Sequence, residues 1–397
     1  MLKRVLIILL FLISSVLGSN NLKLQITNSL VEKGFENVSV TINSTDVVIT
    51  LENRKYRYNV DALTEIMKEI LEFKEVKMIT IVFLKNQIPV VSIKYDNNDF
   101  KNVITDEQKM RTLKEKVIIS YNVSENMSEV SYSNSSNNKF DIIINPGFKG
   151  QFGDYDNPVR AQVNIIPEIR TSFWQGMDLV AQLLIPVYNE FQGEESIHPG
   201  IISFNQNFRL KENYFISSSI GYFTENRYGF DISAAKIFFN GDLIAGFNLG
   251  YTGYLSFISN KIFYSDLYLW TTNFSVEYRI NKYDLTLGIL AGKFLYGDNS
   301  IRLNINREFG EVEIGFFIVH SDRGKSNGGL NFSIPLFPST YARPSTVRLR
   351  TAESFRWEYK VKGELESLIG ITYYTGNTFF RTLKKYNPNL ILNKISK

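Results

Sequence analysis

Residues 243–252 read LIAGFNLGYT, and this stretch sets the fold class. Its odd-numbered residues, Leu243 to Tyr251, are all apolar. Its even-numbered residues, apart from Ile244, are small or polar. Successive side chains of a strand point to opposite faces of a sheet. The stretch therefore predicts a strand with one apolar face and one face of small or polar groups.

The same alternation recurs down the chain and predicts fourteen strands. They are expected at 140–148, 159–173, 176–189, 199–210, 213–225, 228–240, 242–257, 264–280, 283–296, 299–309, 311–321, 327–337, 354–363 and 367–375. Many junctions carry turn residues, such as Asn240-Gly241-Asp242, so consecutive strands should be antiparallel neighbours. Most of these segments exceed the usual length of a globular strand.

These features favour an all-β fold, an antiparallel transmembrane outer-membrane β-barrel of about 12 to 14 strands over residues 140–380. A tilted strand of this length covers the hydrocarbon core of a bilayer. Aromatic residues near strand ends support this interpretation: Tyr214, Tyr222, Tyr254, Phe294 and Tyr296. A soluble β-sandwich would show the same alternation, and its polar face would meet water instead of lining a lumen.

The N-terminus predicts secretion. Residues 1–18 have the form of a signal peptide, with Lys3 and Arg4 before an apolar run from Val5 to Leu17. Thirteen residues are too few to span a bilayer, and no other segment has eighteen uninterrupted apolar residues. The expected location is the bacterial outer membrane. The chain has no cysteine, which excludes a lipid-anchoring cysteine and zinc sites built on thiolates.

Residues 19–100 predict a small α+β domain in the periplasm. The expected order is a helix near 22–31 ended by Gly34, strands at 38–42 and 47–51, a helix capped by Asp61, and strands at 78–84 and 89–95. Residues 101–139 are expected to be a linker with a possible strand at 117–122. Residues 381–397 form a basic C-terminal tail, either solvated or in contact with an anionic lipid or polymer.

Charge and motifs exclude several functions. The net charge of +4, from 44 basic and 40 acidic residues, is too balanced to indicate nucleic-acid binding. No phosphate-binding loop or dinucleotide motif occurs, and no cofactor or metal is implied. His320-Ser321-Asp322 is the one hydrolase-like triplet, but neighbouring residues of a regular strand point to opposite faces. We therefore expect a strand end there.

The predicted lumen is the candidate functional site. Its expected charged lining is Arg160, Arg170, Glu168, Arg302, Glu308 and Arg356, with Arg307 and Glu277 dependent on register. Guanidinium groups suit carboxylates, so this lining could pass or hold an anionic glycan. The alternative is a lumen filled by mutual ion pairs, without transport.

Two segments resemble a known family. One contains Gly147-Phe148 and Gly153-Asp154-Tyr155 and leads to Ile185-Pro186-Val187-Tyr188. The other is Asn331-Phe332-Ser333-Ile334-Pro335-Leu336, a Pro- and Arg-rich passage over 338–350, and Phe355-Arg356-Trp357. With the signal peptide and the N-terminal domain, they resemble the YjbH-like outer-membrane proteins of exopolysaccharide and group 4 capsule systems.

The resemblance implies a non-catalytic outer-membrane barrel that takes part in export or assembly of a surface polysaccharide. The partners that it implies are outer-membrane lipid, the polysaccharide, and a periplasmic or lipoprotein component of the pathway. Two alternatives stay open: a barrel enzyme acting on lipid or glycan, and a passive porin or structural surface protein.

Overall fold

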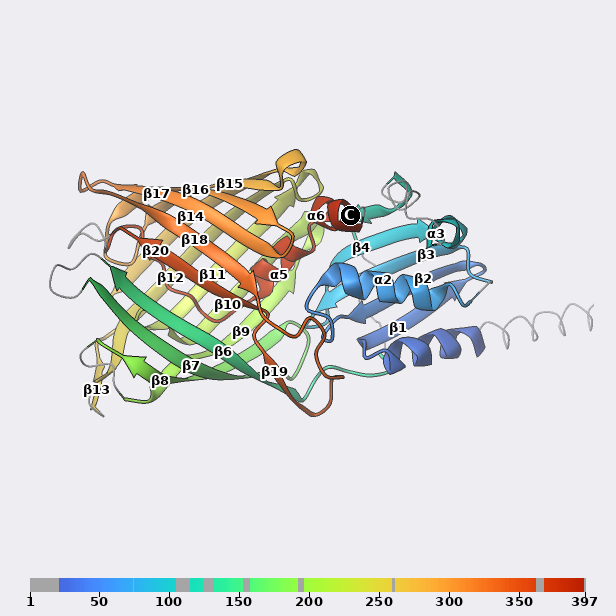
Figure 1. Ribbon diagram of the computed structural model, residues 1–397, viewed down its shortest axis with the longest axis horizontal. Coiled ribbons are helices and arrows are strands. Elements are labelled where there is room, and N and C mark those ends of the chain that lie inside the picture. Colours follow the sequence, from blue (N-terminus) through green and yellow to red (C-terminus); the bar gives the residue numbers. More distant parts are fainter. Residues whose placement is uncertain are drawn as a thin grey trace, which may run out of the picture. The chain divides into compact units, whose positions relative to one another are not determined.

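The computed structural model describes residues 21–73, 75–104, 115–123, 132–152, 158–191, 196–258, 261–361 and 368–395. The signal peptide expected at residues 1–18 lies outside them. The chain forms two compact units (Figure 1). The first contains the residues up to Ser136 together with those from Ile391, and the second is Asn137–Leu390.

The first unit is built on a five-stranded sheet. Its strands follow the order β1 (Glu36–Asn43), β2 (Asp46–Glu52), β3 (Met78–Lys85), β4 (Ile88–Asp96) and β5 (Ile118–Ser120). Strands β2 and β3 are parallel and are connected through helix α2 (Asn59–Ile70), and the other pairs are antiparallel. A helix over residues 21–32 precedes β1, and α3 (Asn97–Ile104) follows β4.

The first helix and α2 are neighbours, joined by an ion-pair cluster. Lys33 Nζ lies 2.9 Å from Glu65 Oε1 and 3.0 Å from Glu69 Oε2. Ser29 Oγ also donates a hydrogen bond to Glu69. The apolar side chains beneath the helices are fully buried, among them Ile26, Leu30, Leu63, Ile66 and Ile70. Burial of this apolar surface provides the main stabilisation of the unit.

Three details of the first unit bear on the sequence expectations. Gly34 adopts φ 93°, the left-handed conformation expected of a helix-ending glycine. Asp61 is not the cap of the second helix, because α2 begins at Asn59 and Asp61 lies in its first turn. Strand β5 pairs with β4, and Ser136 N donates to Asn37 Oδ1 at 2.9 Å. These parts of residues 101–139 therefore belong to the folded unit and are not a linker.

The second unit is a large antiparallel sheet. In chain order its main strands are β6 (Lys139–Phe152), β7 (Val159–Ser172), β8 (Met177–Asn189), β9 (His198–Arg209), β10 (Tyr214–Phe223), β11 (Arg227–Phe238), β12 (Leu243–Ile258), β14 (Leu269–Ile280), β15 (Leu285–Lys293), β16 (Asn299–Phe309), β17 (Val312–Ser321), β18 (Ser326–Pro335) and β20 (Ser354–Lys360). Each pairs antiparallel with the next in this order. The short turns η2 (Lys211–Asn213), η3 (Phe239–Gly241) and η4 (Asn281–Tyr283) join three of the pairs.

Thirteen of the fourteen predicted strands of this unit are confirmed, and one is wrong. The described residues of the segment at 367–375 form no strand. They run into α5 (Phe379–Lys385) and α6 (Pro388–Ile395). Two short strands were not predicted: β13 (Lys261–Tyr264), which pairs with β12, and β19 (Val347–Thr351). The predominance of antiparallel β structure is confirmed.

The two faces of the sheet differ as the alternation predicts. Outward-facing apolar residues are exposed, for example Ile301 at 56% and Phe274 at 59%. Inward-facing polar residues are buried, for example Gln162 at 2% and Thr252 at 0%. This arrangement is opposite to that of a soluble protein, in which the apolar face would be covered. No helix among the described residues is both long and apolar enough to cross a membrane.

The first and last long strands of the sheet do not share a hydrogen-bonded ladder. Strand β6 pairs with β7 on one edge and with the short parallel strand β19 on the other, over Phe140–Ile144. Among the residues that the structure describes, strand β20 pairs with β18 alone. The rest of β6 nevertheless lies beside β20, since Phe148 and Trp357 have ring centroids 5.6 Å apart. The sheet is therefore not closed by backbone hydrogen bonds as the barrel prediction requires.

The ion-pair cluster of the first unit predicts a pH dependence. Burial favours the neutral acid, but hydrogen bonds from Ser29 and Lys33 outweigh it and hold the pKa of Glu69 below its ordinary value of 4.5. A lowered folded-state pKa stabilises the fold above the unfolded-state pKa, and this stability is lost as the pH falls through the folded-state pKa. We expect Glu69→Gln to lower stability at pH 7 by up to about 1 kcal/mol.

Hydrogen–deuterium exchange of α2 in the full chain measures this effect. Exchange in the Gln variant should be faster at pH 7 and should converge with that of the parent below the folded-state pKa of Glu69. The exposed Glu72, which ends the same helix region, provides a control substitution without effect. Equal protection of parent and variant at pH 7 would contradict the assignment.

Candidate functional site

The interior of the large sheet is occupied by residues 369–390, which we call the internal segment (Figure 1). Leu295 N donates to Ile371 O at 3.1 Å, beside the end of β15. Thr224 N, after β10, donates to Tyr374 O at 3.1 Å, and Ser203 Oγ of β9 donates to Thr375 O at 2.6 Å. Because these partners belong to strands far apart in the sheet, the segment crosses the interior instead of adding a strand to the wall.

Tyr373 fixes the middle of the internal segment to the wall. Its hydroxyl donates to Asp231 Oδ2 of β11 at 2.8 Å, and Asn248 Nδ2 of β12 donates to the same oxygen at 2.7 Å. The Tyr373 ring stacks on Phe223 at 5.4 Å. A Cβ atom at Gly250 would overlap the Tyr373 hydroxyl. The small residues on the inner face of residues 243–252 thus make room for this side chain.

Arg170 of β7 provides the most deeply buried charge pairing at the segment. Its guanidinium lies 2.9 Å from Glu168 Oε1 and 2.5 Å from Asp178 Oδ2. The same group donates to the backbone oxygen of Gly376 at 2.9 Å. One cation therefore neutralises two buried acids of the wall and also holds the internal segment.

Helix α5 follows and packs against the wall. Asn377 Oδ1 accepts a hydrogen bond from Phe379 N at 2.8 Å, which satisfies a donor at the helix start. Phe379 packs on Phe215 of β10 with ring centroids 5.9 Å apart. At the other end, Lys384 Nζ lies 2.6 Å from Glu277 Oε1 and Lys385 Nζ lies 2.5 Å from Glu353 Oε2.

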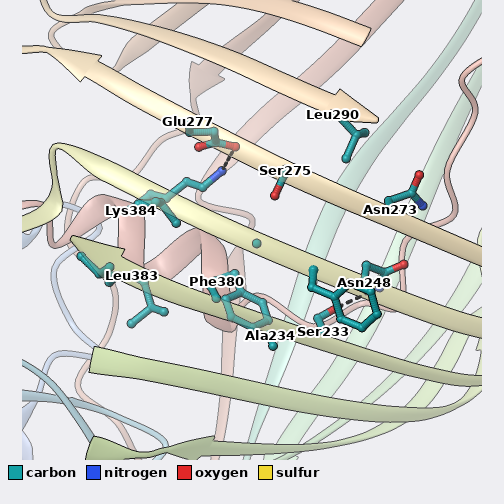
Figure 2. A pocket seen from close by; sticks show the side chains of 15 residues that line it. Ser233, Ala234, Asn248, Asn273, Ser275, Glu277, Leu290, Phe380, Leu383 and Lys384 are labelled. Atoms are coloured by element: carbon teal, nitrogen blue, oxygen red, sulfur yellow. Dashed lines mark hydrogen bonds and ion pairs between the residues drawn. The ribbon is translucent and has the colours of Figure 1, made fainter. Parts of the chain in front are cut away.

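A cavity of about 200 Å³ lies between α5 and strands β11, β12, β14 and β15. Figure 2 shows Phe380 and the Lys384–Glu277 ion pair on one side and Ser233, Asn248, Asn273 and Ser275 on the other. Its volume is below the roughly 300–1,000 Å³ of typical ligand pockets. It has room for a few water molecules rather than for a glycan chain.

The predicted lumen residues do not form one cluster. Glu168 and Arg170 pair at the internal segment, as described above. Arg302 Nη2 lies 2.6 Å from Glu358 Oε2, with its guanidinium 3.9 Å from the Phe317 ring centroid. Glu308 is held by Arg279 at 3.2 Å. Four predicted residues are therefore engaged in ion pairs, which favours the ion-paired alternative for them.

The remaining predicted residues have different surroundings. Arg356 of β20 is an exposed side chain whose Nε lies 3.4 Å from Ser354 Oγ. Arg160 of β7 is half-buried, opposite Gln151. Glu277 is an inner residue and, like the four residues above, forms an ion pair, here with Lys384 at 2.6 Å. The placement of Arg307 in the lumen is wrong, because the odd-numbered residues of β16 face outward and Arg307 lies over the Phe309 ring.

The sequence interpretation missed the internal segment and two arginines that pair with a buried acid. Arg348 Nη2 and Arg350 Nε of β19 lie 2.7 Å and 3.3 Å from Asp141 Oδ2 of β6. A signal for the internal segment was present, since residues after Glu366 contain no acid while Lys384 and Lys385 are basic. These cations complement the acids of the wall, so the expected basic tail at 381–397 is in part an internal structure.

The hydrolase-like triplet is arranged as alternation predicts. His320 Nδ1 lies 2.8 Å from Ser326 Oγ on the exposed side of β17. Ser321 is buried, and its hydroxyl donates to Asp322 Oδ1 at 3.1 Å. The histidine and Ser321 thus point to opposite faces and do not form a nucleophile–base pair.

Fold and site together define a sheet protein with an exposed apolar outer face and an interior crossed by its own C-terminal segment. The model of the YjbH family, described as "Exopolysaccharide biosynthesis protein YbjH", matches residues 16–201. The match covers just under half of the chain, and over these residues the resemblance predicted from the sequence is confirmed. The match includes the segment from Gly147 to Tyr188 and ends before residues 331–357.

No curated protein matches the chain. Two solved chains of OmpT, an outer membrane protein of Vibrio cholerae, are similar to it at 10% sequence identity. The loop L8 deletion mutant covers 47% of this chain and 86% of its own, with a TM-score of 0.25. The in-vitro folded protein covers 53% and 94%, with a TM-score of 0.26. At these TM-scores the likeness carries no argument about the fold.

The pairing of Arg170 predicts a large effect on stability. In Arg170→Met, Glu168 and Asp178 would remain buried without their cation, which typically costs about 3–5 kcal/mol. The urea midpoint of the purified full chain, followed by gel mobility of the unboiled protein, should fall accordingly. Arg307→Met removes an arginine from the outer face and should change the free energy of unfolding by less than about 0.5 kcal/mol. Equal midpoints for the two variants would contradict the role of Arg170.

Proposed function

We propose that this protein takes part in export or assembly of an exopolysaccharide as a non-catalytic component of the bacterial outer membrane. In the membrane the large sheet would close into a transmembrane barrel around the internal segment. The exposed apolar face supports this proposal, since a contiguous apolar surface of this extent requires lipid or a partner. The match of residues 16–201 to the YjbH family model supports the link to exopolysaccharide.

The observation that carries the proposal is the internal segment. A passive porin needs a continuous aqueous lumen. Here residues 369–390 cross the interior and are held by Arg170, Asp231 and Glu277. An interior occupied in this way favours an assembly or accessory role over free diffusion through the protein.

Two predicted residues remain the best candidates for contact with an anionic glycan. Arg160 and Arg356 lie on the inner side of β7 and β20, and Arg356 is exposed. Arg170, Glu168, Arg302 and Glu308 form ion pairs within the chain. Guanidinium groups bind carboxylates in a bidentate manner, so an acidic polysaccharide is the substrate class that fits.

We further propose that the first unit lies in the periplasm and binds a periplasmic or lipoprotein component of the same pathway. Exposed apolar side chains on this unit, Leu24 and Ile118, support the presence of a binding surface. Ile118 belongs to the edge strand β5, and an exposed sheet edge is a common site for addition of a partner's strand.

The role of the two arginines can be tested by measuring the amount of surface polysaccharide in a bacterial strain that needs this protein to make it. The double variant Arg160→Gln/Arg356→Gln should lower surface polysaccharide several-fold while the amount of folded protein in the membrane stays constant. Arg307→Gln, on the outer face, is the matched control and should leave the polysaccharide unchanged. An unchanged level in the double variant would remove these residues from the proposed contact.

Conductance in planar bilayers tests the accessory role against the porin alternative. The full chain should show little conductance, because the internal segment fills the interior. A variant that lacks residues 369–397 should conduct if it retains the folded gel mobility of the parent. Stable, large conductance of the full chain would favour the passive porin.

A further inference from the structure

The cavity between α5 and the wall has a floor of small residues. Strands β11, β12 and β14 place them in one cross-strand row, in which Ala235 lies opposite Gly246 and Gly246 lies opposite Ser275. A Cβ atom at Gly246 would lie only 2.4 Å from Ser275 Oγ, so a larger residue there would displace the serine side chain. Phe380 of α5 lines the cavity on the side of the helix (Figure 2). The open space therefore follows from the small side chains of the wall.

The neighbouring row of the wall supplies polar groups that are held in place. Asn248 Nδ2 donates to Asp231 Oδ2 at 2.7 Å and to Ser233 Oγ at 2.9 Å. Ser233 Oγ donates in turn to Asp231 Oδ1 at 3.1 Å. Because these three side chains are bonded to one another, Asn248 and Ser233 line the cavity in fixed positions. Groups that are fixed before a ligand arrives lose little entropy when they bind it.

Asn273 of β14 is a polar group of the same row that lacks a partner. It lies opposite Asn248, lines the cavity and is 5% exposed. Within the described part of the chain its Oδ1 accepts no hydrogen bond. A buried amide oxygen without a donor is unfavourable. A molecule in the cavity that brings an O–H or N–H group would satisfy it.

The other sides of the cavity are mostly apolar, and one end is open to solvent. Its apolar lining includes Ile237, Leu290 and Leu383. At the open end Lys384 pairs with Glu277, and their side chains are 48% and 29% exposed. These two charges neutralise each other. A small uncharged molecule can therefore enter beside this ion pair without displacing the buried side of α5.

These surroundings match the chemistry of an uncharged six-membered sugar ring. Its apolar C–H face suits the aromatic ring of Phe380, and its hydroxyl groups both donate to and accept from amides and hydroxyls. At about 30 Å³ for each water in the liquid, the cavity of about 200 Å³ holds roughly six or seven waters. One sugar ring with its hydroxyl groups has a similar volume, and a second ring would not fit. Acidic polysaccharides also contain uncharged residues of this kind.

We propose that the cavity is a subsite for a single uncharged sugar ring, which donates a hydroxyl hydrogen bond to Asn273 Oδ1 and packs on Phe380. This inference rests on the proposed function for the origin of the sugar, which is the end of a glycan chain or a free monosaccharide. A sugar bound here contacts the wall and α5 together. It would therefore stabilise the internal segment in its place inside the sheet.

Saturation-transfer NMR on the purified full chain, in a detergent without a sugar headgroup, tests the proposal. Glucose, galactose and mannose are the probes, and at least one of them should bind with a millimolar dissociation constant. Asn273→Leu keeps the side-chain volume but removes the acceptor, and should weaken binding of that sugar about tenfold or more. Ala235→Leu fills the floor of the cavity and should abolish binding.

Asn164 of β7 provides a matched control for Asn273. It is 6% exposed, and its Oδ1 likewise has no partner among the residues described, but it does not line the cavity. Asn164→Leu should leave sugar binding unchanged. Each variant should keep the folded gel mobility of the parent. If Ala235→Leu does not fold, the comparison of Asn273→Leu with Asn164→Leu still decides the outcome.

The outcomes separate this inference from the proposed function. Absence of binding by all three hexoses, or an equal loss of affinity in Asn273→Leu and Asn164→Leu, would overturn the subsite. Surface polysaccharide in cells tests the proposed function independently, so it could fail while sugar binding persists. A disaccharide of the bound hexose distinguishes the two sources of the sugar. Equal affinity would assign the subsite to the end of a chain, and loss of binding would assign it to a free monosaccharide.

Discussion

The large unit depends on the position of one guanidinium group, that of Arg170. This group lies between two buried acids of the wall and the backbone of the C-terminal segment. Arg170 can reach Glu168, Asp178 and Gly376 together only because the segment runs inside the sheet. Without the segment the wall would enclose polar groups that need water. With it, most of those groups find partners within the chain, and the interior becomes a core built from polar contacts.

The part of the fold that could be predicted is the part that the local alternation of apolar and polar residues determines. A period of two is visible in any ten residues, so the strands from β6 to β18 follow from the sequence within a few residues. The faces follow as well, as Ile301 and Gln162 show. Arg307 would face inward only after a shift of one residue near the strand end, and β16 keeps its alternation to Phe309.

The interior could not be predicted in the same way, because its contacts join residues far apart in the sequence. Tyr373 and Tyr374 resemble strand residues locally, and only their partners Asp231 and Thr224 show that they cross the sheet. Strand β19 was missed for a related reason. It lies in a passage rich in proline, and its strand character depends on pairing with β6 and on the ion pairs of Asp141. Charge complementarity was the one available signal.

The internal segment also has a consequence for the order of folding. Arg170 and Gly376 are separated by 206 positions in the chain, and every main strand precedes the segment in sequence. Contacts of such long range form late, because the loops that they close carry a large entropy cost. The strands must therefore pair around a hydrated interior, and water must leave as the last residues arrive. Assembly of the wall and removal of water from its interior become two separate events, and the second waits for residues 369–390.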